Sequence, residues 1–301
     1  MTTGDPNLTA IMSERRQLIN LAYRLLGSLA DAEDVVQETY ARWYAMPRDK
    51  QDGIDNPGAW LTTVASRICL DLLGSARVRR ESYVGEWIPE PLPDQTELAG
   101  DHTVDPADRV TLDESVNMAF LVVLESMTPA ERVAFILHDV FRYPFPEVAT
   151  IVGRTPAACR QLATSARRRL RTAQTPAPPA AERTAIVRDF KQAWAAKDIN
   201  ALITLLDPAA IAIGDGGGLV TAALYPVEGA VDIAHYFVDL AERSGGLTLE
   251  ERLVNGQPGL VVMDAGVAAA VLAFDLEGDR IKHIWAVRNP EKLRPWTSST
   301  P

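Results

Sequence analysis

The sequence predicts a multidomain chain in which two all-α helical domains are followed by an α+β domain. Apolar residues recur at helical spacing through two N-terminal blocks, whereas short strand-like runs with glycine-rich turns fill the last third. Pro-rich segments separate these parts. We expect helical domains at residues 8–83 and 111–171 and an α+β domain at 182–294, joined by linkers at 84–110 and 172–181.

Composition places the chain among ordinary globular proteins. Of its 301 residues, 47% are hydrophobic and 23% are charged. The longest apolar run, Leu260–Phe274, is interrupted by Asp264, and the N-terminus has no signal pattern, so we expect a cytoplasmic protein without membrane contact. Cys69 and Cys159 form neither a disulfide framework nor a metal spacing, so we expect no metal and no cofactor.

Charge is distributed unevenly along the chain. The net charge of −10 argues against indiscriminate binding to polyanions. Residues 1–110 and 176–301 are acidic, with net charges of −7 and −5, but residues 111–175 carry +2. This positive block contains RTPAACRQLATSARRRLR, Arg154–Arg171, which has six arginines and no acidic residue.

Residues 145–171 fit a helix-turn-helix pattern. Glu147–Val152 predicts a short helix, and Gly153 with Arg154 predicts a turn. Thr155 then supplies an N-cap and Pro156 a first helical position. The second helix has one apolar stripe with spacings of four, three and four: Cys159, Ala163, Ala166 and Leu170.

The other side of this second helix predicts contact with a DNA major groove. Polar and small residues near its start suit base edges, and arginines further along suit phosphates. The alternative is a solvated basic face, or arginines that pair with the acidic first block. The candidate residues are Thr155, Ala157, Arg160, Gln161 and Thr164 near the start, and Arg167, Arg168, Arg169 and Arg171 further along.

The segment LADAEDVVQETYARWY predicts an amphipathic helix in the first block. Ala32, Val36, Tyr40 and Trp43 fall on one face. Like charges three and four residues apart gather on another face, at a cost of a few tenths of a kcal/mol each. That face is either merely solvated or a docking surface for a basic partner. Its residues are Asp31, Asp34, Gln37 and Glu38.

A second helix is predicted for NPGAWLTTVASRICLDLLGSARVRR. Leu61, Val64, Ile68 and Leu72 fit its buried side, with Trp60 at the rim. Arginines gather toward its C-terminal end, and an aromatic ring beside arginines suits unpaired DNA. The alternative for Trp60 is core packing. The arginines are Arg67, Arg77, Arg79 and Arg80.

The α+β domain is expected to begin with one amphipathic helix over residues 182–206. Ile186, Phe190, Trp194, Leu202 and Leu205 form its inner face. A further helix is expected near Val231–Arg243. Strands are expected at Ile211–Ile213, Leu247–Val254, Leu260–Met263, Val267–Phe274 and Arg280–Val287.

Residues 8–171 resemble the extracytoplasmic-function group of the sigma-70 family of RNA polymerase sigma factors. DAEDVVQETYARWY is similar to the region 2 helix that docks on the coiled coil of the polymerase largest subunit, which implies this role for Asp31, Asp34, Gln37 and Glu38. NPGAWLTTVASRICLDLL resembles the part that melts and reads the −10 element, which implies that role for Trp60, Arg67, Arg77, Arg79 and Arg80. Residues 145–170 resemble region 4, which reads the −35 element and meets the polymerase flap.

Three further motifs resemble the subgroup with a fused C-terminal SnoaL-like domain: YVGEWIPEPL, DGGG at Asp215–Gly218, and NPEKL at Asn289–Leu293. The resemblance implies an NTF2-like cone that regulates the sigma factor in place of a separate anti-sigma protein, in a stress response. Asp215, Gly216, Gly217 and Gly218 are then regulatory interdomain residues, because glycines allow close approach of another backbone.

The function expected from these features is promoter-specific transcription initiation with built-in regulation, rather than catalysis. Core RNA polymerase and promoter DNA are the expected partners, and the cone is a candidate site for a small-molecule ligand. One alternative is an isomerase- or cyclase-like enzyme attached to a DNA-binding module. A simple operator-binding repressor is the other, but it leaves the acidic helix face unexplained. Polar residues that an enzyme would use are Asp215, Tyr225, His235, Asp275 and His283.

Overall fold

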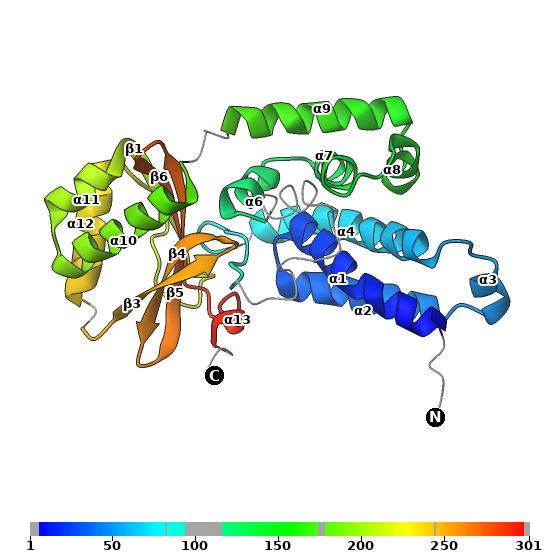
Figure 1. Ribbon diagram of the computed structural model, residues 1–301, viewed down its shortest axis with the longest axis horizontal. Helices are drawn as coiled ribbons and strands as arrows, with labels where there is room; N and C mark the ends of the chain where they lie inside the picture. The colour runs from blue at the N-terminus through cyan, green and yellow to red at the C-terminus, as the bar shows by residue number, and fades with distance from the viewer. Residues whose placement is uncertain (1–5, 82, 94–115, 174–177, 244, 298–301) are drawn as a thin grey trace. The chain divides into compact units, whose positions relative to one another are not determined.

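A computed structural model describes residues 6–81, 83–93, 116–173, 178–243 and 245–297, without the side chains of residues 6–13 and 76–81. The chain forms two compact units (Figure 1). Among the described residues, the first comprises 6–79 and 123–170, and the second comprises 80–81, 83–93, 116–122, 171–173, 178–243 and 245–297. None of the described helices is long and apolar enough to cross a bilayer.

The first unit is helical, as the sequence predicts. Helices α1 and α2 pack against each other, and α7 packs against α8. Three helices cross the boundary between the units, because α4 and α9 end in the second unit and α6 begins in it. The bounds are α1 Pro6–Leu26, α2 Leu29–Tyr44, α3 Arg48–Asp52, α4 Pro57–Glu81, α6 Met118–Glu125, α7 Pro129–Phe135, the π-helix η1 Ile136–Val140, α8 Phe145–Val152 and α9 Pro156–Ala173.

Side-chain caps begin several of these helices and satisfy amide groups that have no partner inside the helix. Ser28 accepts from the amide of Asp31 at 3.2 Å at the start of α2. Thr128 and Glu131 form a reciprocal capping box at α7. Thr155 accepts from the amide of Ala158 at 3.1 Å, which confirms the predicted cap before Pro156.

The second unit contains a six-stranded sheet with the order β2-β1-β6-β5-β4-β3. Strands β1 and β6 pair in parallel, and the other neighbours are antiparallel. The predicted α+β class is confirmed. The bounds are α10 Ala180–Ala196, α11 Ile199–Leu205, β1 Leu206–Asp215, β2 Val227–Glu228, α12 Ala230–Arg243, β3 Thr248–Val254, β4 Gln257–Asp264, β5 Val267–Glu277, β6 Arg280–Val287 and α13 Arg294–Thr297.

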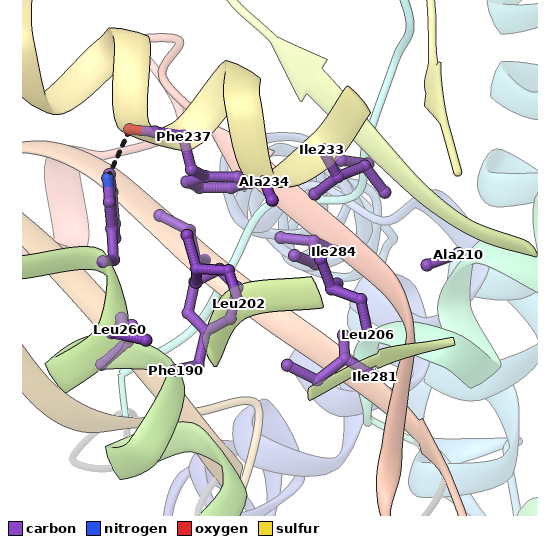
Figure 2. Packing of buried hydrophobic residues seen from close by; sticks show 14 of the residues in the cluster. Phe190, Leu202, Leu206, Ala210, Ile233, Ala234, Phe237, Leu260, Ile281 and Ile284 are labelled. Carbon is purple, nitrogen blue, oxygen red and sulfur yellow. Dashed lines mark hydrogen bonds between the residues drawn. The ribbon is translucent and has the colours of Figure 1, made fainter. Parts of the chain in front are cut away.

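Helices α10, α11 and α12 cover one face of this sheet with an aromatic-rich core (Figure 2). The rings of Phe190 and Phe237 meet edge to face with centroids 5.3 Å apart. Trp194 is buried and donates from Nε1 to the carbonyl of Phe237 at 2.7 Å, the dashed bond in Figure 2. Since indole N–H groups need an acceptor when buried, this bond fixes α10 against α12.

The prediction of one continuous helix over residues 182–206 is wrong. The helix ends after Ala196, because Lys197 adopts a left-handed conformation with φ of 57°. Asp198 then caps a new helix by accepting from the amide of Ala201 at 3.0 Å. The apolar spacing continues across the break, so Ile186, Phe190, Trp194 and Leu202 are all buried as expected.

The opposite face of the sheet carries a second apolar cluster. Val271, Ala273 and Trp285 point to this face, whereas their neighbours Leu272 and Ile284 belong to the helix-covered core. The cluster is completed by residues from outside the sheet, namely Ile88, Met118 and Leu293. The described part of the predicted linker therefore packs on the C-terminal domain.

Candidate nucleic-acid interface

The predicted helix-turn-helix is formed by α8 and α9. Gly153 ends α8 with φ of 69°, a left-handed conformation that glycine adopts without a steric penalty. Cys159, Ala163 and Ala166 are fully buried and Leu170 nearly so, which confirms the predicted apolar stripe. The turn and the stripe together determine which side of α9 faces solvent.

The solvent-facing side of α9 contains nearly all of the predicted DNA-binding residues. Arg167 differs, because its guanidinium is half-buried and donates to both carboxylate oxygens of Asp139 at 2.6 and 3.1 Å. This ion pair fastens α9 to η1. The exposed candidates are Thr155, Ala157, Arg160, Gln161, Thr164, Arg168, Arg169 and Arg171.

A second contact fixes α9 against α7. Ser165 donates its hydroxyl to Glu131 at 2.7 Å, and Glu131 also accepts from Thr128. Burial alone would raise the pKa of Glu131, but these hydrogen bonds to the charged carboxylate outweigh it and lower the pKa. The ionised capping residue thus joins the two helices at neutral pH.

The acidic face of α2 is accessible to solvent. Asp34, Gln37 and Glu38 are exposed, whereas Asp31 in the first turn is half-buried. Glu38 pairs with Arg42 at 2.8 Å, four residues later on the same exposed surface. The opposite face is buried through Ala32, Val36 and Trp43, so α2 is amphipathic as predicted.

Helix α4 presents Trp60 and Arg67 near α2 and α8. Trp60 is half-buried and meets Trp43 edge to face, with ring centroids 5.2 Å apart. Arg67 is exposed and donates from Nη2 to the carbonyl of Thr150 in α8 at 3.0 Å. The side chains of Arg77, Arg79 and Arg80 lie outside the described residues.

Arg132 joins two distant parts of the first unit. Its buried guanidinium donates from Nη1 to the carbonyl of Leu25 at 2.9 Å and to Glu125 at 2.7 Å. Leu25 lies in the last turn of α1, where carbonyl groups have no partner inside the helix. Burial lowers the pKa of Arg132 to about 10, so it remains charged at neutral pH.

In the second unit, Asp215 is completely buried and binds the segment that follows α4. One carboxylate oxygen accepts from the Tyr83 hydroxyl at 2.7 Å and from the Gly217 amide at 3.0 Å. The other accepts from the Ile88 amide at 3.0 Å and from Lys292 Nζ at 2.6 Å. Burial, together with the hydrogen bond to Asp215, raises the pKa of Tyr83 well above its usual value.

Lys292 and the glycines complete this contact. Lys292 Nζ also donates to the carbonyl of Ile88 at 2.5 Å and lies 4.2 Å from the centroid of the Trp87 ring, within cation–π range. A Cβ atom at Gly217 would overlap the side-chain amide of Asn289. At Gly218 it would lie 3.0 Å from Val84, so these positions require glycine for the segment to approach.

Asn255 forms hydrogen bonds with the residues on either side of the segment 94–115. Its side-chain oxygen accepts from the amide of Leu92 at 3.0 Å, and its amide group donates to the carbonyl of Val116 at 2.8 Å. Asn255 occupies the turn between β3 and β4 with φ of 53°, a conformation that asparagine tolerates. We refer to these two hydrogen bonds as the Asn255 clamp.

The sequence indicated some of these contact residues and missed others. Tyr83 and Lys292 lie inside the motifs YVGEWIPEPL and NPEKL, although no role follows from either motif alone. Asn255 precedes Gly256, a typical hairpin turn, and nothing local predicts its contact with Leu92.

The polar residues considered for an enzyme do not gather at one place. Tyr225 and His235 are exposed, and Asp215 is bound to the segment described above. Asp275 and His283 lie on paired strands with Oδ2 and Nδ1 3.0 Å apart. Within the described residues, no group of three or more His, Cys, Asp or Glu side chains is arranged to hold a metal.

Comparison with known proteins identifies the family. The family model of sigma-70 region 2 matches residues 10–79, and that of sigma-70 region 4 matches residues 117–170. The chain is 39% identical to the ECF RNA polymerase sigma factor SigJ of Mycobacterium tuberculosis, across 93% of this chain and 90% of the relative. The chain belongs to the extracytoplasmic-function RNA polymerase sigma factors.

Further similarities extend over the whole length of this sigma factor. It is 34% identical to the probable ECF RNA polymerase sigma factor SigI of M. tuberculosis, across 98% of this chain and 97% of the relative. The crystal structure of M. tuberculosis SigJ superposes with a TM-score of 0.74 and 34% identity, covering 96% of this chain and 98% of that one. The similarity therefore includes the C-terminal domain.

Regions 2 and 4 define the activity of this sigma factor. It directs promoter-specific initiation of transcription and binds core RNA polymerase and promoter DNA. The predicted family and the predicted role in promoter-specific transcription initiation are confirmed.

Proposed function

We propose that this sigma factor divides promoter recognition among three helices and regulates it through the C-terminal domain. Helix α2 docks on the coiled coil of the polymerase largest subunit, α4 holds the opened −10 strand, and α9 reads the −35 element, with region 4 against the flap. The domain regulates by binding, without a catalytic step, and the protein acts in the cytoplasm with the polymerase. The residues assigned to docking are Asp31, Asp34, Gln37 and Glu38, and those assigned to the −10 strand are Trp60, Arg67, Arg77, Arg79 and Arg80.

The exposed carboxylates of α2 support the docking role. Asp34 and Glu38 lie on a solvent-facing side, and the buried side of the same helix fixes their direction. Complementary charge accelerates encounter with a basic partner and sets its orientation more than it adds affinity. Substitutions on this face should therefore slow association with core polymerase.

Two features of α4 support its role at the −10 element. Trp60 keeps part of its ring accessible while Trp43 supports the rest, as expected for a platform on which an unpaired base stacks. Arg67 donates a hydrogen bond to the backbone carbonyl of Thr150 in the free protein. Since a phosphate is a stronger acceptor than a neutral carbonyl, DNA would displace this contact.

The observation that carries the regulatory role is the burial of Asp215 against residues 83–88. These residues directly follow α4, the helix assigned to the −10 strand. The Asn255 clamp also fastens Val116, two residues before α6. The C-terminal domain thus acts on both ends of the connection between regions 2 and 4 and biases the spacing of the two DNA-binding parts.

In vitro transcription tests this function. The full chain and a version ending at Thr175 are added separately to sigma-free core polymerase over a genomic promoter library. We expect specific transcripts from the full chain and a changed yield from the shortened one, with the ratio showing whether the C-terminal domain inhibits or assists. Equal yields at every promoter would contradict the regulatory role, and failure of the full chain to bind core polymerase would contradict the docking role.

Substitutions in α9 should separate phosphate contacts from base contacts. Arg168→Ala is expected to weaken binding similarly on all sequences and to reduce the salt slope of affinity by about one. Gln161→Ala should instead relax the preference at one −35 position, where a good base contact is worth about 1–3 kcal/mol. Affinity measured at several salt concentrations on single-base variants distinguishes the two, and equal losses on every promoter from Gln161→Ala would refute its assignment.

A further inference from the structure

Phe145 contacts two side chains that come from different elements of region 4. Its ring stacks on His138 of η1 with centroids 3.8 Å apart and an interplanar angle of 26°. The guanidinium carbon of Arg160 in α9 also lies over the Phe145 ring, 5.6 Å from the centroid. Phe145 itself is the first residue of α8, so the stack spans three successive helical elements.

The imidazole of His138 is fixed by hydrogen bonds to the backbone. Nδ1 of His138 lies 2.9 Å from the carbonyl oxygen of Tyr143, and since a carbonyl only accepts, Nδ1 carries the proton. The Tyr143 amide in turn donates to the carbonyl of Leu137 at 2.9 Å. The imidazole is therefore held in one orientation, and the half-buried Phe145 ring stacks on it.

Arg160 and Arg167 contrast in how they are held. Arg167 uses two of its N–H groups on Asp139. A cation–π contact engages the face of the aromatic ring and consumes none of the five N–H donors of Arg160. Arg160 is exposed, so its guanidinium N–H groups remain available for the O6 and N7 acceptors of a guanine. This is the commonest specific arginine contact in a major groove.

We propose that Phe145 is a positioning residue for promoter recognition: it orients the guanidinium of Arg160 before DNA binds. Long side chains lose rotamer entropy when they are fixed on a partner, so a restrained arginine contributes more discrimination per hydrogen bond. Phe145 touches no base in this role and acts only through Arg160. The inference rests on the proposed assignment of Arg160 to a base edge.

The test compares Phe145→Leu and Phe145→Tyr, each with and without Arg160→Ala, in holoenzyme formed with core polymerase. Binding is measured on promoter duplexes that carry every single-base change in the −35 element. We expect Phe145→Leu to lower the preference for the best base at one position by roughly two- to fivefold, the size of an exposed cation–π contact. Phe145→Tyr keeps the ring face and should retain the preference. Salt dependence should be unchanged in all variants, because no phosphate contact is removed.

Each outcome separates the positioning role from a structural one. If Phe145→Leu has no further effect once Arg160 is alanine, Phe145 acts through Arg160; an equal effect in both backgrounds means that it only supports the fold, which overturns the inference. If Arg160→Ala changes the base preference but Phe145→Leu does not, the positioning role of Phe145 is wrong and the base assignment of Arg160 stands. If Arg160→Ala does not change the base preference, both the positioning role and the base assignment are wrong. Phe145→Met replaces the leucine variant if the latter does not unfold cooperatively.

Discussion

Asp215→Asn is expected to loosen residues 83–93 from the C-terminal domain. The substitution leaves Lys292, whose side chain is 10% exposed, without the carboxylate 2.6 Å from its Nζ. Removing one partner of a buried ion pair costs about 3–5 kcal/mol, because the remaining charge stays desolvated. A loss of about 3 kcal/mol corresponds to roughly a hundredfold faster exchange of the Ile88 amide hydrogen, measured by hydrogen–deuterium exchange.

Two further variants control this result. Glu277→Gln breaks a pair with Lys282 of the same 2.6 Å length on the exposed surface, where such pairs contribute about 0–1 kcal/mol, and should leave Ile88 unaffected. Asp215→Asn combined with Lys292→Met removes both charges and should restore part of the protection. Unchanged exchange of Ile88 in the single variant would show that the carboxylate does not hold the segment.

Arg132→Met is expected to lower the free energy of unfolding of the first unit by about 3 kcal/mol. Methionine fills a similar apolar volume but removes the donor from the carbonyl of Leu25 and the counter-charge from Glu125. The Arg132 side chain is only 3% exposed, so both contacts lie where water has little access. Urea unfolding followed by a helix signal measures the change.

Arg42→Met provides the matched comparison within the same unit. Its pair with Glu38 is 2.8 Å long, but the two side chains are 53% and 51% exposed, so the expected loss is below about 1 kcal/mol. Similar losses for both variants would mean that burial does not determine the contribution of Arg132.

Local chemistry explains which parts of the fold were predictable. The start of α9 depends on Thr155 and Pro156, and its buried stripe on the spacing from Cys159 to Leu170, so both follow from adjacent residues. Strand β6 was predicted with its observed bounds, because glycine or asparagine turns flank a β-branched and aromatic run. The break at Lys197 was missed, since a non-glycine residue with positive φ gives little local signal.

The contacts of Asp215 depend on long-range pairing and were only partly predictable. The sequence singled out Asp215–Gly218 for close approach, but the partner residues 84–88 were assigned to a linker and Tyr83 to the end of the first helical domain. Tyr83 and Asp215 are 132 positions apart, and their hydrogen bond depends on the register of the whole sheet. Asn255 and Lys292 could not be assigned for the same reason, because their partners precede the domain in the chain.

Asn255 binds both Leu92 and Val116, so these two residues would stay bound even if the chain between them were cut. A peptide-bond cut inside that range would leave an N-terminal fragment that still carries Tyr83, Ile88 and Leu92, and a C-terminal fragment that carries Asp215, Asn255 and Lys292. Every hydrogen bond between these two sets would survive the cut, since none of them involves residues 94–115. The two pieces would therefore remain a non-covalent complex, with the N-terminal piece supplying the bound segment in trans.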